Sequence, residues 1–474
     1  MKTLTISCLV FLLMANSFSL SAQRAMVMSK ADTLKPKVTK ETMDNNMDGM
    51  NMDSMNMKAD TTKPEMKMKG HNNHRMNMPM TSSYSVNIPM SRDGSGTSWQ
   101  PDESHTYMLM KMIDKTSLMF HENIFLRYTK QDLFKKGSRG GDKIDAPNWF
   151  MGMLNSHVGE KGLFTATAMI SLDPVTEGGR GYPLLFQSGE SWKGTKLVDR
   201  QHPHDLFSAL AIGYSYAINK DIDINAYFGY PGEPALGPPV FMHRNSAMNI
   251  PDAPISHHWQ DATHITFVTA TLGFRYKNLK LEGSTFNGRE PDEDRYNFDK
   301  LRFDSYSYRV SVNPTENWAI QFSQGFLKSP EPLEPGINIT RTTASVLYSE
   351  HFPSLGHFDG TLVWGLNSSH PGRNENSFLA EANLQAEKNA FYTRYEFVQK
   401  SSEEMDLDIL FGERRFNLNV FTLGYSRTLT HGNTFLLAAG IQSSLNFPDK
   451  MLQAMYWKAP LGGEIYLRIY PAVH

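Results

Sequence analysis

Histidine and aspartate side chains are concentrated in one polar stretch of the chain, residues 197–264. The candidate functional residues in it are His202, His204, Asp205, His243, His257, His258, Asp261 and His264. Imidazole and carboxylate groups are ligands for zinc and other transition metals, and they also carry out general acid–base catalysis. No motif of fixed spacing, such as H-E-x-x-H, links these residues. Any site would therefore have to be assembled from separate loops.

Three interpretations compete for this stretch. The residues can pack a loop inside a lumen and form a constriction, as in barrels that are plugged by their own loops. They can form a metal or substrate site where the loops meet. They can also be catalytic, since Ser246 and Ser256 lie near the histidines, but neither serine lies in a G-x-S-x-G motif and no base–acid pair accompanies them. We therefore expect no enzymatic activity.

A second group of candidate ligands lies nearer the N-terminus, where 14 of the 28 methionines fall between Met26 and Met90. The candidate metal ligands are Met43, Met47, Met50, Met52, Met55, Met57, Met66, Met68, His71, His74, Met76, Met78 and Met80. Thioether sulfur is a soft, uncharged ligand that suits Cu(I) or Ag(I). The M-x-M and M-x-x-M spacings allow several sulfurs to converge on one ion. The competing interpretation is a methionine-rich linker that binds nothing.

The N-terminal residues 1–22 have the features of a secretory signal peptide: a lysine, an apolar run and small residues before the expected cleavage point. The only cysteine, Cys8, lies inside this segment, and too little apolar sequence precedes it for a lipoprotein signal. The mature chain is therefore expected to have no disulfide.

Residues 23–98 contain few large aliphatic or aromatic side chains, so we expect a disordered periplasmic segment, the leader. Residues 99–115 are expected to be a linker. The net charge of −2 argues against a nucleic-acid partner. After the signal peptide, no apolar run is long enough for a membrane-spanning helix.

From residue 116 onward, the dominant pattern is the alternation of apolar and polar residues. Between residues 221 and 230, for example, Ile222, Ile224, Ala226 and Phe228 alternate with Asp221, Asp223, Asn225 and Tyr227. Such strands have one apolar and one polar face. We therefore expect residues 116–474 to form an all-β domain.

The connections between these strands alternate in length. Short turns are predicted at residues 158–161, 219–220, 277–278, 314–317, 351–356, 388–389 and 430–433. Longer polar connections are predicted at residues 173–205, 231–263, 288–303, 329–336, 367–376, 401–412 and 448–462. Seven hairpins with one further strand at each end give a transmembrane antiparallel β-barrel of about 16 strands, with 14 strands as an alternative. A soluble β-sandwich or propeller would not require this alternation.

Two resemblances bear on function. The leader resembles the Met/His-rich leaders of bacterial copper-resistance proteins. The motifs DRQHPHDL, GYPGEPALGPP, HHWQDATH and FNGREPDE together resemble a poorly characterised family of bacterial outer-membrane β-barrels that is met beside copper-handling proteins. The second resemblance covers roughly residue 109 to the end. It implies a barrel in a metal-stress context and names no substrate.

The combined hypothesis is an outer-membrane barrel with a periplasmic, metal-capturing leader, acting in copper or silver binding, tolerance or export. Its expected partners are outer-membrane lipid, metal ions and periplasmic copper-handling proteins. The first alternative is a porin-like channel for small solutes whose leader is only a tether. The second alternative is an outer-membrane hydrolase.

We expect a peptide that spans residues 23–98 to bind Cu(I). Because thioether sulfurs would be the ligands, replacing the methionines from Met43 to Met57 by leucine should abolish this binding. Competition against a Cu(I) chelator measures the effect. A native peptide that takes no Cu(I) from the chelator would remove the hypothesis for the leader.

Overall fold

The computed structural model describes residues 80–430, 432 and 434–472. The predicted signal peptide and the candidate ligands from Met43 to Met78 lie outside these residues. Met80 is the one leader ligand within them, and its side chain is exposed.

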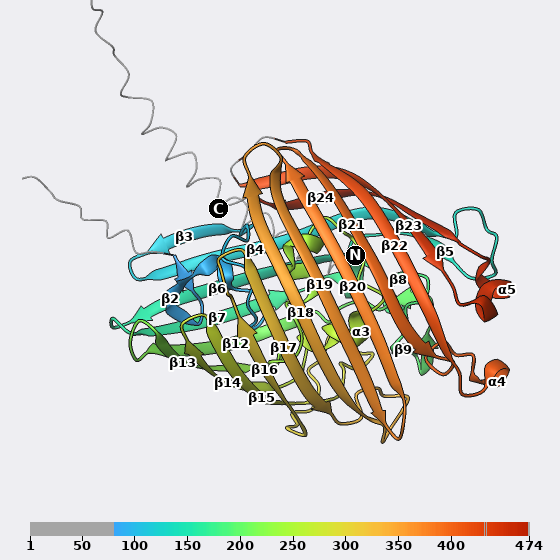
Figure 1. Ribbon diagram of the computed structural model, residues 1–474, viewed down its shortest axis with the longest axis horizontal. Helices are drawn as coiled ribbons and strands as arrows, with labels where there is room; N and C mark the ends of the chain where they lie inside the picture. The colour runs from blue at the N-terminus through green and yellow to red at the C-terminus, as the bar shows by residue number, and fades with distance from the viewer. Residues whose placement is uncertain (1–79, 431, 433, 473–474) are drawn as a thin grey trace, which may run out of the picture. The chain divides into compact units, whose positions relative to one another are not determined.

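The described residues form a closed antiparallel barrel of 16 long strands (Figure 1). Its first eight strands are β4 (Thr116–Gln131), β6 (Asn148–Val158), β7 (Gly162–Ile170), β12 (Phe207–Ala217), β13 (Ile222–Gly229), β14 (Thr269–Tyr276), β15 (Leu279–Phe286) and β16 (Ser305–Val312). The second eight are β17 (Trp318–Leu327), β18 (Asn338–Phe352), β19 (Gly356–His370), β20 (Asn374–Ala386), β21 (Asn389–Ser401), β22 (Arg415–Thr428), β23 (Phe435–Phe447) and β24 (Leu461–Pro471). Pairing of β24 with β4 closes the ring. The predicted fold class and the count of 16 are confirmed.

Two short strands pair with opposite ends of β4. β3 (Leu109–Ile113) pairs with the first residues of β4, and β5 (Gly141–Asp145) pairs with its last residues. Neither spans the barrel, so neither adds to the count of long strands.

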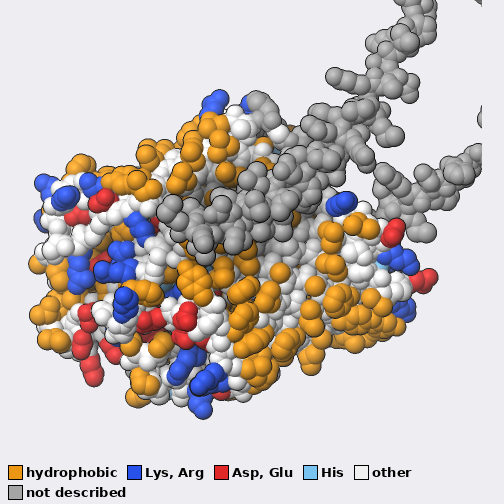
Figure 2. All heavy atoms as spheres, turned by 180° about the vertical axis from the view of Figure 1, so that it is seen from behind, with side chains coloured by type: hydrophobic (Ala, Val, Ile, Leu, Met, Phe, Trp, Pro, Cys, Tyr) orange, Lys and Arg blue, Asp and Glu red, His pale blue; other side chains and the backbone are white. Residues whose placement is uncertain are grey.

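The alternation of side chains along the strands separates a polar lumen from an apolar exterior. On β13, Asp223 and Asn225 are buried inside the barrel, whereas Ile224 and Phe228 face outward and are exposed. Figure 2 shows apolar side chains over much of the outer surface and charged side chains toward its ends. An exposed apolar belt around a closed antiparallel barrel is the signature of a transmembrane β-barrel.

All seven predicted hairpins are present, with short turns between β6 and β7, β12 and β13, β14 and β15, β16 and β17, β18 and β19, β20 and β21, and β22 and β23. We call the end of the barrel that carries these turns the turn end. One predicted long connection, residues 367–376, is wrong: β19 and β20 extend into it and leave only residues 371–373 between them. Among the described residues, no helix is long and apolar enough to cross a membrane.

The prediction that the whole of residues 23–98 is disordered is wrong for residues 80–98. This part forms β1 (Thr81–Ser82), β2 (Ser85–Pro89) and the 3-10 helix η1 (Met90–Arg92). Together with the first part of the predicted linker it makes a segment inside the barrel, residues 80–108, which we call the plug. The side chains of Tyr84, Ile88 and Trp99 are buried. The physical reason for the difference is that these few side chains bury against the barrel wall, which the composition of the whole leader does not reveal.

Polar contacts fix the plug near the turn end. Thr165 Oγ1 on β7 donates to the carbonyl of Ser83 at 2.7 Å, and Asn155 Nδ2 on β6 donates to Ser83 Oγ at 3.1 Å. Asn87 Nδ2 donates to the carbonyl of Asn219 in the turn between β12 and β13. The lumen wall and one turn therefore supply hydrogen-bond partners for polar groups of the plug, which a buried segment requires.

We expect Tyr84→Ala to loosen the plug. Tyr84 is 9% exposed, and its ring packs edge-on against that of Tyr227 with 6.1 Å between centroids. Truncation of a buried aromatic side chain costs about 3–5 kcal/mol, so hydrogen exchange of residues 80–98 should become faster. Tyr296→Ala, at a position that is 54% exposed, is the control. Unchanged protection of the plug in Tyr84→Ala would contradict its docking.

Candidate functional site

The connection between β13 and β14, residues 230–268, folds into the lumen; we call it the inner loop. It carries four short helices: η2 (Phe241–His243), η3 (Asn245–Ala247), α3 (His257–Gln260) and η4 (Ala262–His264). Its prolines and glycines prevent longer regular structure. Gly237, with φ at +93°, allows the loop to double back closely, because a Cβ there would lie 2.5 Å from the carbonyl oxygen of Gln260.

Arg244 anchors the inner loop to the barrel wall. Its guanidinium is fully buried and donates from Nη1 to Asp261 Oδ2 at 2.6 Å and from Nε to Glu381 Oε2 on β20 at 2.9 Å. Nη1 also donates to the carbonyl of Pro239 at 3.0 Å. The three contacts join the first half of the inner loop, its second half and the wall.

A second anchor lies farther along the loop. Arg127 on β4 donates to the Asp252 carboxylate at 2.6 Å and to the carbonyl of Pro251 at 2.9 Å, and it also pairs with Asp145 at 2.8 Å. The inner loop is thus fixed to two separate wall strands, β4 and β20.

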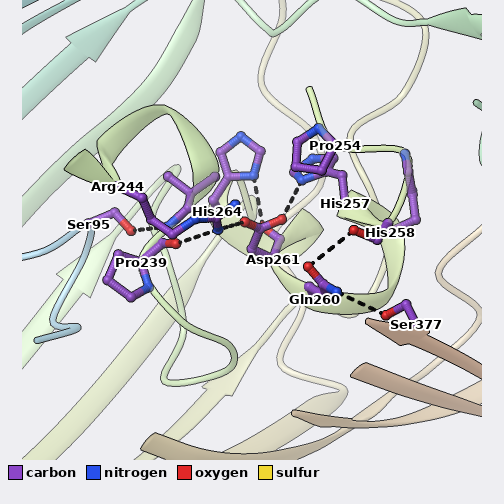
Figure 3. Close-up of polar contacts among 12 residues, drawn as sticks. Ser95, Pro239, Arg244, Pro254, His257, His258, Gln260, Asp261, His264 and Ser377 are labelled. Carbon is purple, nitrogen blue, oxygen red and sulfur yellow. Dashed lines mark hydrogen bonds and ion pairs between the residues drawn. The ribbon is translucent and has the colours of Figure 1, made fainter. Parts of the chain in front are cut away.

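Asp261 connects the anchor to two histidines (Figure 3). Its Oδ1 lies 2.6 Å from His257 Nδ1, and its carbonyl oxygen lies 3.1 Å from His264 Nδ1. Burial raises the pKa of Asp261, but the positive charge of Arg244 and the bond from His257 outweigh it and hold the pKa well below its ordinary value. The carboxylate is therefore ionised and orients the imidazole of His257, whereas the backbone carbonyl of Asp261 orients that of His264.

Five of the six histidines in residues 197–264 come together. His202 and His204 end the connection between β7 and β12, and His257, His258 and His264 belong to the inner loop. The ring centroids are separated by 5.1 Å for His257 and His264, 5.3 Å for His257 and His258, 5.5 Å for His204 and His264, and 5.6 Å for His202 and His258. We call these five residues the histidine cluster.

The other two candidates point elsewhere. His243 lies outside the cluster, with its ring 4.6 Å from that of Trp149 on β6. Asp205 pairs with Arg295 of the connection between β15 and β16, at 3.3 Å. Burial raises the pKa of Asp205 to about 6, although Arg295 acts in the opposite direction.

Most imidazoles in the cluster are held through Nδ1. His204 Nδ1 lies 2.7 Å from Asp173 Oδ2, and His202 Nδ1 lies 3.1 Å from the carbonyl of Pro203. The Nε2 atoms of His202, His204 and His264 are buried and make no hydrogen bond; the Nε2 of His202 lies 3.3 Å from a Glu190 oxygen without the geometry of a hydrogen bond. Histidines oriented through one nitrogen are common at metal sites. Within the part of the chain that the structure describes, however, no group of three or more His, Cys, Asp and Glu is arranged to hold a metal ion.

The cluster is electrostatically uneven. Burial and the nearby Arg295 lower the pKa of His202 well below its ordinary value, and burial with the neighbouring histidines does the same to His264. Burial also acts on His258, but Glu290, 3.4 Å from its Nδ1, outweighs it and raises the pKa. The surroundings therefore favour protonation of His258 and disfavour protonation of His202 and His264.

Three cavities follow one another through the lumen. A vestibule of about 860 Å³ opens among the turns between β18 and β19, β20 and β21, and β22 and β23, and His105 and Tyr107 line it. The same two residues line a second cavity of about 100 Å³. This cavity shares Trp149, Met242 and Met248 with a third, of about 40 Å³, which reaches His202 and His204.

The sequence predictions missed the second cavity. Its lining is rich in methionine and histidine, and these residues come from the plug, β4, β6 and the inner loop. The feature of the sequence that could have predicted it is the alternate spacing, on two strands, of Met119 with His121 and of Met151 with Met153. We call this cavity the methionine cavity.

No family model matches the chain, and no curated protein matches it. Among solved structures, Salmonella typhi OmpF in complex with daunomycin is similar at a TM-score of 0.48 and 8% identity, covering 77% of this chain and 99% of that one. An anion-selective porin from Comamonas acidovorans has a TM-score of 0.44 and 9% identity, covering 75% and 99%. Pseudomonas putida OprB has a TM-score of 0.44 and 8% identity, covering 75% and 94%. At these identities the likeness concerns the fold alone.

We expect His257 to make the packing of the inner loop sensitive to pH. Burial lowers the pKa of His257 from its ordinary value of 6.5, with Asp261 acting in the opposite direction. The contribution of the neutral side chain is therefore complete above about pH 6.5 and is lost as the pH falls through the lowered value. Hydrogen exchange in residues 231–268 should be slower in the native protein than in His257→Leu at pH 7.5, and this difference should shrink at pH 5. If the difference grew toward pH 5, the predicted direction of the pH dependence would be wrong.

Proposed function

We propose that this protein is a gated channel of the outer membrane that passes small ions or solutes, with the inner loop as its gate. The observation that carries the proposal is a closed 16-strand barrel whose lumen is filled by polar, ion-paired segments of its own chain. Barrels of about 16–18 strands enclose an aqueous channel unless something fills it. Here the filling segments are the inner loop and the plug.

The way in which the lumen is filled supports a movable obstruction. Arg244, Asp261 and Glu381 fix the inner loop through charge-assisted contacts, and Asn249, Ser256 and Gln260 add hydrogen bonds to the wall. Water can replace such polar contacts when a loop moves, whereas it cannot replace the contacts of an apolar core. The vestibule and the two smaller cavities mark the path that remains while the loop is in place.

In this proposal the methionine-rich leader collects Cu(I) or Ag(I) in the periplasm, and the barrel anchors it in the outer membrane. The support for this part is the methionine and histidine content of residues 43–80 together with the soft character of thioether ligands. Periplasmic copper-handling proteins are the partners that this role implies. A channel without any metal role is the simpler form of the same proposal.

The hydrolase alternative gains no support from its two candidate serines. Ser246 Oγ lies within hydrogen-bonding distance of Thr361 Oγ1, at 2.8 Å, and of Glu381 Oε2, at 3.1 Å. Ser256 Oγ lies 3.2 Å from Gln260 Oε1 and 3.4 Å from Glu396. Both hydroxyls are thus used to hold the inner loop, and the contacts described for them include no histidine that could act as a base.

Removal of the Arg244 side chain tests the gate. Arg244→Ala leaves the buried carboxylate of Asp261 without its arginine partner and removes one of the two from Glu381, which keeps Arg394 at 2.9 Å. Breaking a buried ion pair by removing one partner costs about 3–5 kcal/mol. We expect larger or more frequent openings in planar bilayers than for the native protein.

Arg373→Ala is the matched control, because Arg373 pairs with Glu403 at 2.8 Å and its side chain is 33% exposed. Its conductance should equal that of the native protein. If the native protein and Arg244→Ala both fail to conduct at any voltage, the channel proposal is wrong. If both conduct equally, the inner loop is not the gate.

A further inference from the structure

We propose that the methionine cavity is a binding site for a soft monovalent cation, Cu(I) or Ag(I), inside the barrel. Twelve methionines follow Met90 in the sequence, and six of them line this one cavity; Met90 itself makes seven. Three histidines, His105, His121 and His243, share the lining. The site is separate from the candidate metal ligands of the leader, of which Met80 alone lies within the described residues.

Two wall strands place four of these side chains side by side. In the ladder of β4 and β6, Met119 is directly opposite Met153, and His121 is directly opposite Met151. Alternation directs all four toward the lumen, as it does the neighbouring Asn155, which bonds to the plug. Directly opposed side chains have Cβ atoms about 4.5–5.5 Å apart. Their sulfur and nitrogen atoms can therefore approach one ion.

Two internal segments cover this patch. Met90 and Met108 of the plug are buried and pack against Met119. From the inner loop come Met242 and Met248. Thioethers thus surround the cavity from the wall, from the plug and from the inner loop. A methionine side chain is flexible enough to bring its sulfur into contact with a bound ion without movement of the backbone.

The chemistry of the lining favours a soft ion of single charge. Thioether and imidazole are neutral ligands of the kind that Cu(I) and Ag(I) take. Two acidic residues, Asp93 and Glu122, also line the cavity. The carboxylate of Asp93 is occupied by bonds from Ser82 Oγ at 2.5 Å and from the amide of Ser83 at 2.6 Å. Arg244 and Arg468 bring positive charge to the lining, and they repel a divalent cation twice as strongly as a monovalent one.

Packing alone does not account for the cavity. Methionine usually fills irregular gaps in a core, yet here a void of about 100 Å³ remains among seven methionines. A void of about 10–15 Å³ by the same measure already admits one water molecule. The lining also contains the Nδ1 of His105, which is buried and has no hydrogen-bond partner. Space and an unused nitrogen ligand thus occur at the same place.

The methionine cavity lies between the other two cavities, so we place the metal site on the conduction path; this step rests on the proposed channel function. Residues shared between cavities connect it to the vestibule at the turn end and to the third cavity, at His202 and His204. A soft cation that enters from the turn end meets the methionine site first and the histidine cluster next. The substrate class that we assign to the channel is therefore a soft monovalent metal ion.

The test uses Ag(I) as a redox-inert probe on the full-length chain. The background protein carries leucine in place of every leader methionine from Met43 to Met80, so that the leader no longer competes. We compare it with the same protein carrying Met119→Leu and Met153→Leu, and with a control carrying Met405→Leu and Met455→Leu. The two control methionines belong to the apolar cluster around Tyr456, away from the cavity. Methionine and leucine have similar volumes, so both pairs should fold.

We expect the background and control proteins to bind Ag(I) saturably, as measured by chelator competition and by a rise in the unfolding temperature. The cavity variant should bind Ag(I) at least about tenfold more weakly. Mutation of residues that merely hydrogen-bond to metal ligands already weakens metal binding by about this factor. X-ray absorption of the bound Ag(I) should show sulfur neighbours in the background protein. Zn(II) should not raise the unfolding temperature.

Other results overturn the site. Absence of saturable binding to the background protein, equal affinity in the cavity variant, or a shell of oxygen alone around Ag(I) would each do so. Conductance of K⁺ is measured on the same proteins to separate the two proposals. Conductance without Ag(I) binding refutes the metal site and leaves the channel proposal standing. Ag(I) binding without conductance supports the metal site and refutes the proposal that it lies on a conduction path.

Discussion

The position of the histidine-bearing part of the inner loop depends on a buried arginine. The guanidinium of Arg244 is fully buried and is stabilised by the carboxylates of Asp261 and Glu381 and by a carbonyl oxygen. A buried charge without such partners costs several kilocalories per mole, so the position of the inner loop and the ionisation of both carboxylates are determined together. Asp261 in turn orients His257 and His264. The orientation of these two members of the histidine cluster therefore follows from the anchor.

The sequence was sufficient to predict the wall and insufficient to predict what fills it. Alternation along β13 and the short turns predicted hairpins correctly because a lipid-facing strand must be apolar on one side throughout its length. Residues 80–98 obey no such rule. Their burial depends on a few contacts with strands that are distant in the sequence, such as that of Tyr84 with Tyr227 on β13. Average composition could not reveal those contacts.

The candidate residues show the same limit. Sequence proximity grouped His243 with the other histidines, but the turn at Gly237 and the anchor at Arg244 send it to a different cavity. Met119 and Met153 are 34 positions apart, and each alone looks like an ordinary apolar residue in a strand. Only the register of β4 and β6 makes them neighbours. Register is a property of the folded sheet, so no single-strand pattern contains it.

The pairing of β4 has a mechanical consequence. β24 occupies the edge of β4 at residues 124–130, and β3 occupies the same edge at residues 116–120. Sliding of β24 toward the beginning of β4 would collide with β3, and a slip of one residue would turn every lipid-facing side chain of β24 toward water. The seam at which the barrel closes is thus locked in place. A solute that passed through this barrel would therefore travel along its axis, past the plug and the inner loop.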